Sequence, residues 1–190
     1  MTIIRTVPEA DATGAVAAIY ADDVDELGYV APHTAAMAMN PEALHAFEQL
    51  IRSVVPTLGL RRYELVTLAA ARGTGSAHCR LAHGAKVLSK GLFGEAQLER
   101  IARDYRDAGL ADDEVAMMAY AEQVGRDASA MTEADALALR EAGFGDREIV
   151  DITIAASARV YFGSALQALA VDVDAPPMLG PAVRAALDPR

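Results

Sequence analysis

Residues 61–83 read RRYELVTLAAARGTGSAHCRLAH, and this stretch predicts two helices joined by a short glycine turn. In its first part, leucine and alanine recur at the three- and four-residue spacing of one apolar helix face, which predicts a helix over residues 61–72. Gly73-Thr74-Gly75 then interrupts that helix. A second helix is expected to start near Ser76 and to end near Lys90.

The same helical pattern extends over nearly the whole chain, and no segment alternates polar and apolar residues as a convincing strand would. Local signals support helix ends: Asn40-Pro41 suits a start, Thr132 with Asp135 suits a capping arrangement, and Gly28 suits a stop. The further predicted helices cover residues 9–27, 41–56, 95–105, a segment from Asp112, a segment from Thr132, 146–169 and a short tail after Pro176-Pro177. We therefore expect an all-α helical bundle that forms a single domain over residues 1–190.

The composition argues against several classes of protein. The chain has 190 residues, of which 53% are apolar, so it can bury a core and is not a disordered protein. Its net charge of −10 disfavours nucleic acid as a partner, and no basic run offers a patch for membranes. We see neither a signal-peptide pattern nor an uninterrupted apolar run of about 18 residues, so the expected location is the reducing cytoplasm. One cysteine can form neither an internal disulfide nor a cysteine-rich zinc site.

That cysteine, Cys79, lies close to two of the four histidines, His78 and His83. A thiol reacts as its thiolate, and a nearby base or positive charge favours that form. On a helix, Ser76, Cys79 and His83 fall within an arc of about 60° and share one face, while His78 lies about 100° from Cys79 on the flank. If the helix begins at Ser76 or Thr74, Cys79 lies in its first turn, where the helix dipole and a charged histidine both lower the pKa of a thiol.

A structural role is the alternative for each of these residues. A lone cysteine in an alanine-rich helix is most often an inert core residue, and the two histidines would then be solvated or satisfied core side chains. Glu64, in a charged segment, is ordinarily a surface residue. His33 and His45 stand apart in the sequence and receive no role, and Tyr63 is taken as structural.

The combination of Glu64, a spacer, Ser76-Ala77-His78-Cys79 and His83 resembles the motif of the alkylhydroperoxidase AhpD and carboxymuconolactone decarboxylase superfamily. The family pattern is a glutamate, a spacer, Cys-x-x-Cys and a histidine four residues later. Residues 62–70 resemble the lead-in helix of that family and residues 117–170 its C-terminal half, so the likeness covers roughly residues 40–170. Within that superfamily, the sequence most resembles the peroxidase-related branch, whose members have a similar length. The chain departs from the pattern because Ser76 stands in place of the first cysteine.

The resemblance implies a hydroperoxidase-like antioxidant protein with an AhpD-like fold and with neither a metal nor an organic cofactor. By position, Cys79 matches the cysteine that meets peroxide, and Glu64, His78 and His83 match the proton relay. Because Ser76 cannot form the family's disulfide, Cys79 would work alone and an external thiol would have to reduce it. Family likeness also implies a homo-oligomer, a trimer or a hexamer.

Two other functions compete with this one. A decarboxylase-like enzyme would act on a small carboxylic acid or lactone without redox chemistry, using Glu64 and His83 as its acid–base pair. Against it, an anionic substrate needs cationic anchors, and Arg72 and Arg80 are the main basic residues that flank the motif. The third alternative, which Ser76 keeps open, is an oligomer without catalytic activity that serves as a binding or scaffold protein.

Overall fold

The computed structural model describes residues 2–188, and within them every regular element is a helix, which confirms the all-α prediction. The α-helices are α1 (Gly14–Leu27), α2 (Pro32–Met37), α3 (Pro41–Gly73), α4 (Ala77–Ser89), α5 (Glu95–Asp104), α6 (Asp112–Asp127), α7 (Glu133–Glu141), α8 (Asp146–Ala168) and α9 (Pro181–Leu187). Three single 3-10 turns lie at Glu9–Asp11, Tyr105–Asp107 and Ala128–Ala130.

Most helix ends lie where the local sequence signals predict them. The Asn40 side chain accepts a hydrogen bond from the backbone N–H of Ala43 at the start of α3. The Thr132 backbone N–H donates to Asp135 over 2.7 Å at the start of α7. Gly28, at the end of α1, adopts the left-handed conformation that favours glycine.

Three boundaries differ from the prediction. The helices expected over residues 41–56 and 61–72 are the two halves of α3, which meet at a kink at Gly59, whose φ of 72° is not helical; the first half therefore runs past Pro56 instead of ending there. The first helix starts at Gly14 rather than residue 9, because a 3-10 turn and two extended residues, Ala12 and Thr13, precede it. The short helix α2 was not predicted, since its six residues are too few to show a helical period.

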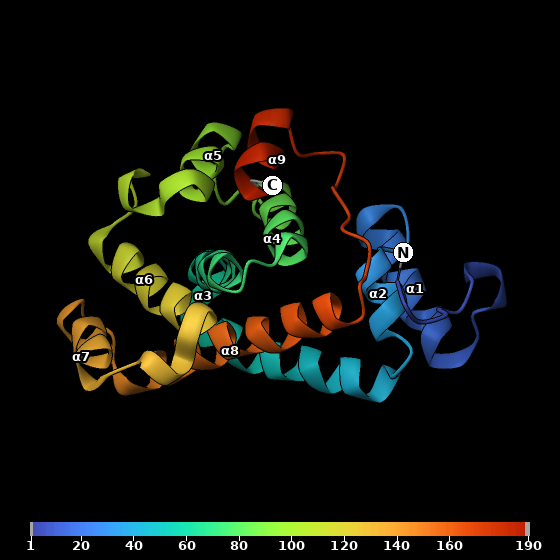
Figure 1. Ribbon diagram of the computed structural model, residues 1–190, viewed down its shortest axis with the longest axis horizontal. Helices are drawn as coiled ribbons and strands as arrows, with labels where there is room; N and C mark the ends of the chain where they lie inside the picture. Colours follow the sequence, from blue (N-terminus) through green and yellow to red (C-terminus); the bar gives the residue numbers. More distant parts are fainter. Residues whose placement is uncertain (1, 189–190) are drawn as a thin grey trace.

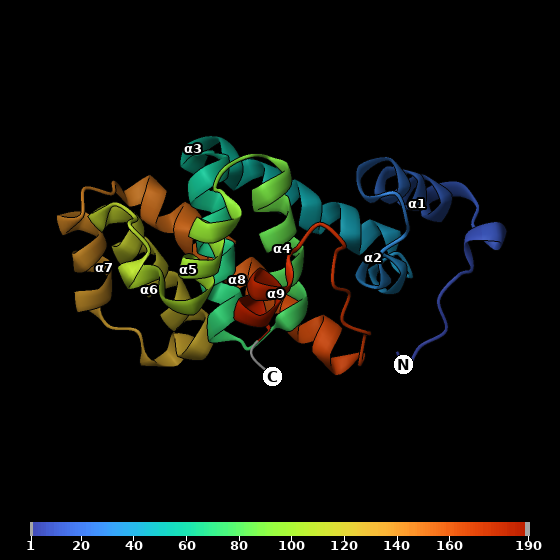
Figure 2. The same ribbon diagram turned by 90° about the horizontal axis from the view of Figure 1, so that it is seen from above.

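The long helix α3 is the centre of the molecule, and α4, α6 and α8 pack directly against it. In both views α1 and α2 lie at one end of the molecule and α7 lies at the other, while α5 and α9 pack together beside α4 (Figure 1, Figure 2). The second half of α3 therefore has neighbours on several sides, and every residue from Tyr63 to Ala71 is buried.

Two glycines allow α3 and α6 to touch backbone to backbone. A Cβ atom added to Gly73 would lie 2.2 Å from the carbonyl oxygen of Glu122, and one added to Gly125 would lie 2.3 Å from that of Ala70. Any other residue at either position would force the two helices apart.

Helix α8 alone, among the described residues, is long and apolar enough to cross a membrane by length and composition. Half of its most apolar window is buried inside the molecule, where it packs against α3 and α6. A core helix of a folded domain meets the same criteria, and the surroundings of α8 are those of a core helix.

Candidate active site

Cys79 lies in the first turn of α4, as the glycine turn before it predicts. Ser76 is the N-cap residue, and its Oγ accepts a hydrogen bond from the backbone N–H of Cys79 over 3.4 Å. The Cys79 side chain is 3% exposed and belongs to a small apolar cluster that joins α1, α2, α3 and α8. Gly163 of α8 covers both residues: a Cβ there would lie 3.2 Å from Ser76 Oγ and 3.7 Å from Cys79 Sγ.

Glu64 and His83 are in direct contact, although they are far apart in the sequence. Glu64 extends from the buried half of α3 and is fully inaccessible to solvent, so its ordinary surface role does not apply. Its Oε2 atom lies 2.6 Å from His83 Nδ1 on α4, and the other ring nitrogen, Nε2, lies 2.9 Å from Arg159 Nη1 on α8. Because a guanidinium can only donate, Nε2 accepts and the ring proton belongs on Nδ1, which donates to Glu64.

The charge states of Glu64, His83 and Arg159 follow from the surroundings of these three hydrogen-bonded residues. Burial lowers the pKa of His83, and the positive Arg159 lowers it further, although Glu64 opposes both. Burial raises the pKa of Glu64, but His83, Lys86 and Arg159 outweigh it, so this pKa lies below its ordinary value. At neutral pH this hydrogen-bonded series therefore contains an ionised Glu64, a neutral His83 and a positive Arg159. A neutral imidazole held by a carboxylate in this way can act as a base.

His78 is turned to different partners. Its Nε2–H donates to the backbone carbonyl of Val171, just after α8, over 3.1 Å, and its ring lies edge-on to His33 with centroids 6.1 Å apart. Burial lowers the pKa of His33 to about 4, helped by the neighbouring His78, so His33 is neutral at physiological pH. The structure thus joins Glu64 to His83 and holds His78 separately, with the unassigned His33 as its neighbour.

A cavity of about 630 Å³ brings these groups to one surface, since Cys79, His78, His83, Glu64 and Arg159 all line it. It also contacts three residues to which the sequence gave no role, namely His33, His45 and Tyr63. Ser76 lines instead a second cavity of about 850 Å³, to which Cys79 does not contribute and which His78 also reaches.

Sequence reasoning missed Arg159. It lies 76 positions after His83 in the chain, in the apolar helix α8, and is 5% exposed. The only local signal is a charged residue among small and apolar neighbours in a predicted core helix. Such a signal marks a residue that needs a partner, but the partner can be named only from the fold.

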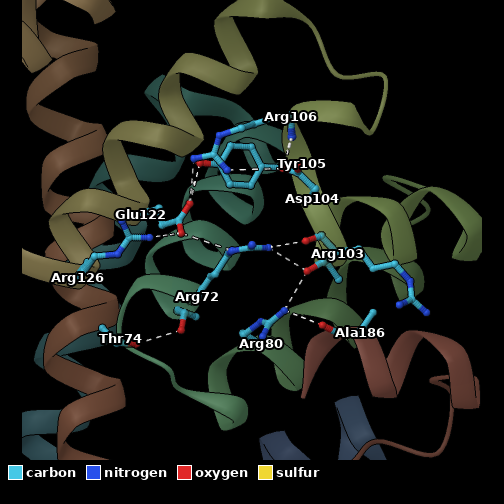
Figure 3. A network of polar contacts seen from close by, with 12 residues as sticks. Arg72, Thr74, Arg80, Arg103, Asp104, Tyr105, Arg106, Glu122, Arg126 and Ala186 are labelled. Atoms are coloured by element: carbon cyan, nitrogen blue, oxygen red, sulfur yellow. Dashed lines mark hydrogen bonds and ion pairs between the residues drawn. The ribbon is translucent and has the colours of Figure 1, made fainter. Parts of the chain in front are cut away.

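The two arginines that flank the motif do not line the cavity with Cys79. Arg80 donates to the carbonyl oxygens of Ala102 and Ala186, and Arg72 donates to the carbonyls of Ala102 and Arg103 (Figure 3). Arg72 also belongs to a set of polar residues around one buried carboxylate, here called the Glu122 network: Glu122, Tyr105, Arg72, Arg106 and Arg126.

Solved structures with the same fold are found among peroxidase-related proteins. One, described as an alkylhydroperoxidase AhpD core and an uncharacterized peroxidase-related protein from Ralstonia eutropha JMP134, has a TM-score of 0.78 and 18% identity, over 98% of this chain and 96% of that one. An uncharacterized peroxidase-related protein from Silicibacter sp. TM1040 has a TM-score of 0.77 and 27% identity, over 92% of each chain. These neighbours support the AhpD-like superfamily.

A third similar structure is a cysteine-to-alanine variant of the debrominase Bmp8 in complex with 2,3,4-tribromopyrrole. It has a TM-score of 0.75 and 13% identity, over 100% of this chain and 97% of that one. No family model matches the sequence, and no curated protein sequence matches it.

Proposed function

We propose that the protein is a thiol-dependent hydroperoxidase in which Cys79 is the reacting group and His83, held by Glu64, carries the protons. The observation that supports it most strongly is the 2.6 Å contact between Glu64 and His83 on the wall of the cavity that Cys79 also lines. A carboxylate that orients the imidazole beside a nucleophile is a recurring arrangement in nucleophilic catalysis.

The proposed cycle needs one cysteine and two external thiols. His83 takes the proton of the Cys79 thiol, the thiolate attacks the terminal oxygen of ROOH, which carries the hydrogen, and the O–O bond breaks. Cys79 is oxidised to a sulfenic acid, and the leaving alkoxide takes a proton from His83 to give ROH. One external thiol then forms a mixed disulfide with Cys79 and releases water. A second thiol restores Cys79 and leaves as the external disulfide.

Ser76 defines how this cycle differs from a two-cysteine cycle. Its hydroxyl is an N-cap that binds the backbone of Cys79, so it positions α4 without taking part in electron transfer. His78, which bonds to Val171, holds the segment after α8 against the N-terminal part of α4 and is proposed to shape the cavity. The reductant, a small external thiol, must therefore reach Cys79 through the cavity.

A non-redox enzyme that acts on a small carboxylic acid or lactone is the second candidate. The sequence offered no suitable cationic anchor for such a substrate, but Arg159 supplies one beside His83. In this function Glu64 and His83 would move a proton of the substrate and Cys79 would be incidental. A protein of this fold that carries no catalytic activity remains the third candidate.

For the assembly and location, we propose a cytoplasmic homo-oligomer, a trimer or a hexamer. Large apolar side chains that stay exposed support an interface between copies, among them Val24 and Leu27 of α1 and Tyr161 of α8. Light scattering after size-exclusion chromatography measures the mass, and a monomer would contradict the proposal.

The test compares Cys79→Ser with Ser76→Ala. With an alkyl hydroperoxide and dithiothreitol, Cys79→Ser is expected to lose at least about a thousandfold in rate, because the hydroxyl is a poor nucleophile for peroxide. Ser76→Ala removes a helix cap, which costs about 1 kcal/mol of stability, but should keep the rate within about twofold.

The oxidised form of Cys79 is identified by mass spectrometry after a peroxide pulse in the presence of dimedone, which forms a stable adduct with a sulfenic acid. If peroxide consumption survives Cys79→Ser, the one-cysteine mechanism is wrong. If wild type consumes no peroxide and forms no adduct, the acid–base function or the non-catalytic function replaces it.

A further inference from the structure

We propose that the cavity beside Cys79 is a binding site for an organic carboxylate, with Arg159 as the residue that binds the carboxylate group. The inference deepens the proposed function, on which it rests for the reacting group: the preferred peroxide would carry a carboxylate on an apolar body. The binding step itself depends on Arg159 and the cavity, and not on the chemistry of Cys79.

Arg159 is a buried cation that the His83 ring separates from Glu64, the carboxylate on which its charge acts. Its side chain is almost fully enclosed, and its Nε atom has no hydrogen-bond partner among the described residues. A buried charge without a counter-charge is costly, so such residues are kept where a ligand supplies the counter-charge. The other buried arginine of residues 2–188, Arg80, is satisfied by the carbonyl oxygens of Ala102 and Ala186 and keeps no orphaned nitrogen, whereas Arg159 does.

Two aromatic rings hold the guanidinium in place. Its central carbon lies 5.3 Å from the ring centroid of Phe47 and 5.4 Å from that of Phe162, and the two rings stack on each other 4.9 Å apart. His83 Nε2 fixes one of its terminal nitrogens. The planar group is thus pre-oriented, which reduces the entropy lost when it binds an anion.

The charges around the cavity favour a ligand with one negative charge over a ligand with two. Arg159 and Lys86 both act on Glu64, so an anion finds attraction at this part of the wall. Glu64 already bonds to His83 through Oε2 and does not compete as an ion-pair partner of Arg159. Elsewhere the lining is acidic: Asp22, Asp23, Glu26 and Glu48 face a single further cation, Arg52, and would repel a dianion such as phosphate more strongly than a monoanion.

The size of the cavity and its apolar side chains indicate what the rest of the ligand is like. The cavity volume of about 630 Å³ lies in the range of small-molecule sites, and Leu44, Phe47, Ile51 and Phe162 contribute apolar side chains to it. A small acid with an apolar chain or ring satisfies both features, with its carboxylate on Arg159 and its body against the aromatic pair.

The test is calorimetric titration, without peroxide, of hexanoate, its neutral analogue hexanamide, and inorganic phosphate. Wild type is expected to bind hexanoate at least about tenfold more tightly than hexanamide, and phosphate more weakly than hexanoate. In Arg159→Gln the preference for hexanoate should disappear. The matched control is Arg140→Gln, which removes the same charge at an exposed α7 residue that pairs with Asp146 and does not line the cavity. It should keep the preference.

Equal binding of hexanoate and hexanamide by wild type would overturn the inference, and so would an unchanged preference in Arg159→Gln or tighter binding of phosphate. If Arg159→Gln does not fold, Arg159→Lys replaces it: it keeps the charge, loses the planar fork and should weaken hexanoate more than hexanamide. Equal weakening of the two ligands would overturn the inference.

The link to the proposed function is tested separately with two hydroperoxides, one bearing a carboxylate and one neutral. Arg159→Gln should raise KM for the acidic hydroperoxide about tenfold more than KM for the neutral one. Any change in kcat that follows from losing the contact with His83 should be the same for both substrates. If the wild-type protein binds hexanoate but consumes no peroxide, the proposed function alone is refuted. If it consumes peroxide but Arg159→Gln changes KM equally for the two hydroperoxides, the carboxylate site alone is refuted.

Discussion

Glu64 and Glu122 are two buried carboxylates on packed helices, and their surroundings differ. Glu122 on α6 receives the Tyr105 hydroxyl over 2.7 Å and Arg126 over 2.6 Å, with Arg72 and Arg106 also close (Figure 3). Glu64 on α3 contacts His83 through one oxygen, while its other oxygen has no hydrogen-bond partner among the described residues. The first carboxylate is surrounded by partners, and the second borders a cavity.

The difference separates a structural cluster from a candidate site. Where donors surround a buried charge, as in the Glu122 network, the desolvation cost is offset inside the protein, and the cluster joins α3, α6 and the 3-10 turn Tyr105–Asp107. Where Glu64 and Arg159 each keep an unpartnered atom, the cost is not fully offset in the free protein. Such incomplete satisfaction beside a cavity and a nucleophile is typical of a functional site.

Replacing each of the two carboxylates by glutamine tests most directly whether one is structural and the other functional. Glu122→Gln should lower the free energy of unfolding by about 2 kcal/mol, because it leaves several arginines and Tyr105 around a neutral amide. Urea denaturation followed by circular dichroism measures it. The peroxidase rate of the folded protein should stay unchanged, and a matching loss of rate would show that the network belongs to the site.

Glu64→Gln should have the opposite profile. The amide can still accept the proton of His83 Nδ1, so we expect little loss of stability, but it no longer stabilises a positive imidazole. The rate of Cys79 alkylation by iodoacetamide near neutral pH should fall about tenfold. An unchanged alkylation rate would remove Glu64 from the proton relay, and unfolding of the variant would make Glu64 structural like Glu122.

The smallest expected effect is a loss of folding stability in acid, which would come from the buried histidines near Glu64 and not from the Glu122 network. Burial lowers the pKa of His33 to about 4 and also lowers the pKa of His83, so both rings are neutral in the folded state where the unfolded chain already binds protons. Asp174 opposes this shift at His33, while His78, His83 and Arg159 support it. Stability is therefore full above about pH 6.5 and falls as the pH drops toward 4, by about 1 kcal/mol at pH 5 when partial exposure of His33 is allowed for.

Urea midpoints measured from pH 7.5 to pH 5 check this slope. His33→Gln should flatten it, because one of the two groups that resist protonation is removed. The lowered pKa of Glu64 contributes stability that is present above its unfolded pKa of 4.5 and is lost as the pH falls below that value, so it does not obscure the window. A flat profile for wild type, or an equal slope in His33→Gln, would contradict the assignment.

Features that depend on neighbours in the sequence were predictable. The cap at Ser76, the placement of Cys79 in the first turn of α4, and the capping of α7 by Thr132 and Asp135 all need only a few adjacent residues. The bend in α3 was misplaced for the same reason. Pro56 is a strong local stop signal, yet tertiary packing carries the helix through it and Gly59 takes up the bend.

Features that depend on contacts between distant segments could not be derived from local patterns. The spacing of Glu64 and His83 was noticed through resemblance, but burial of Glu64 and its direct bond to His83 follow from the packing of α3 against α4. Arg159 and His33 have no local pattern that links them to Cys79. The arginines that looked suitable by proximity, Arg72 and Arg80, are bound to other groups because helical geometry turns them away from the cavity that Cys79 lines.

The contact of Gly73 with Gly125 has a consequence for how distant relatives of this chain can be recognised. Because each glycine faces a carbonyl oxygen of the opposite helix at a distance no side chain can occupy, a related sequence that keeps this crossing must keep both glycines, even where its cysteines and histidines have changed. The pair is thus expected to persist in relatives of any chemistry. It offers a signature of ancestry that is independent of function.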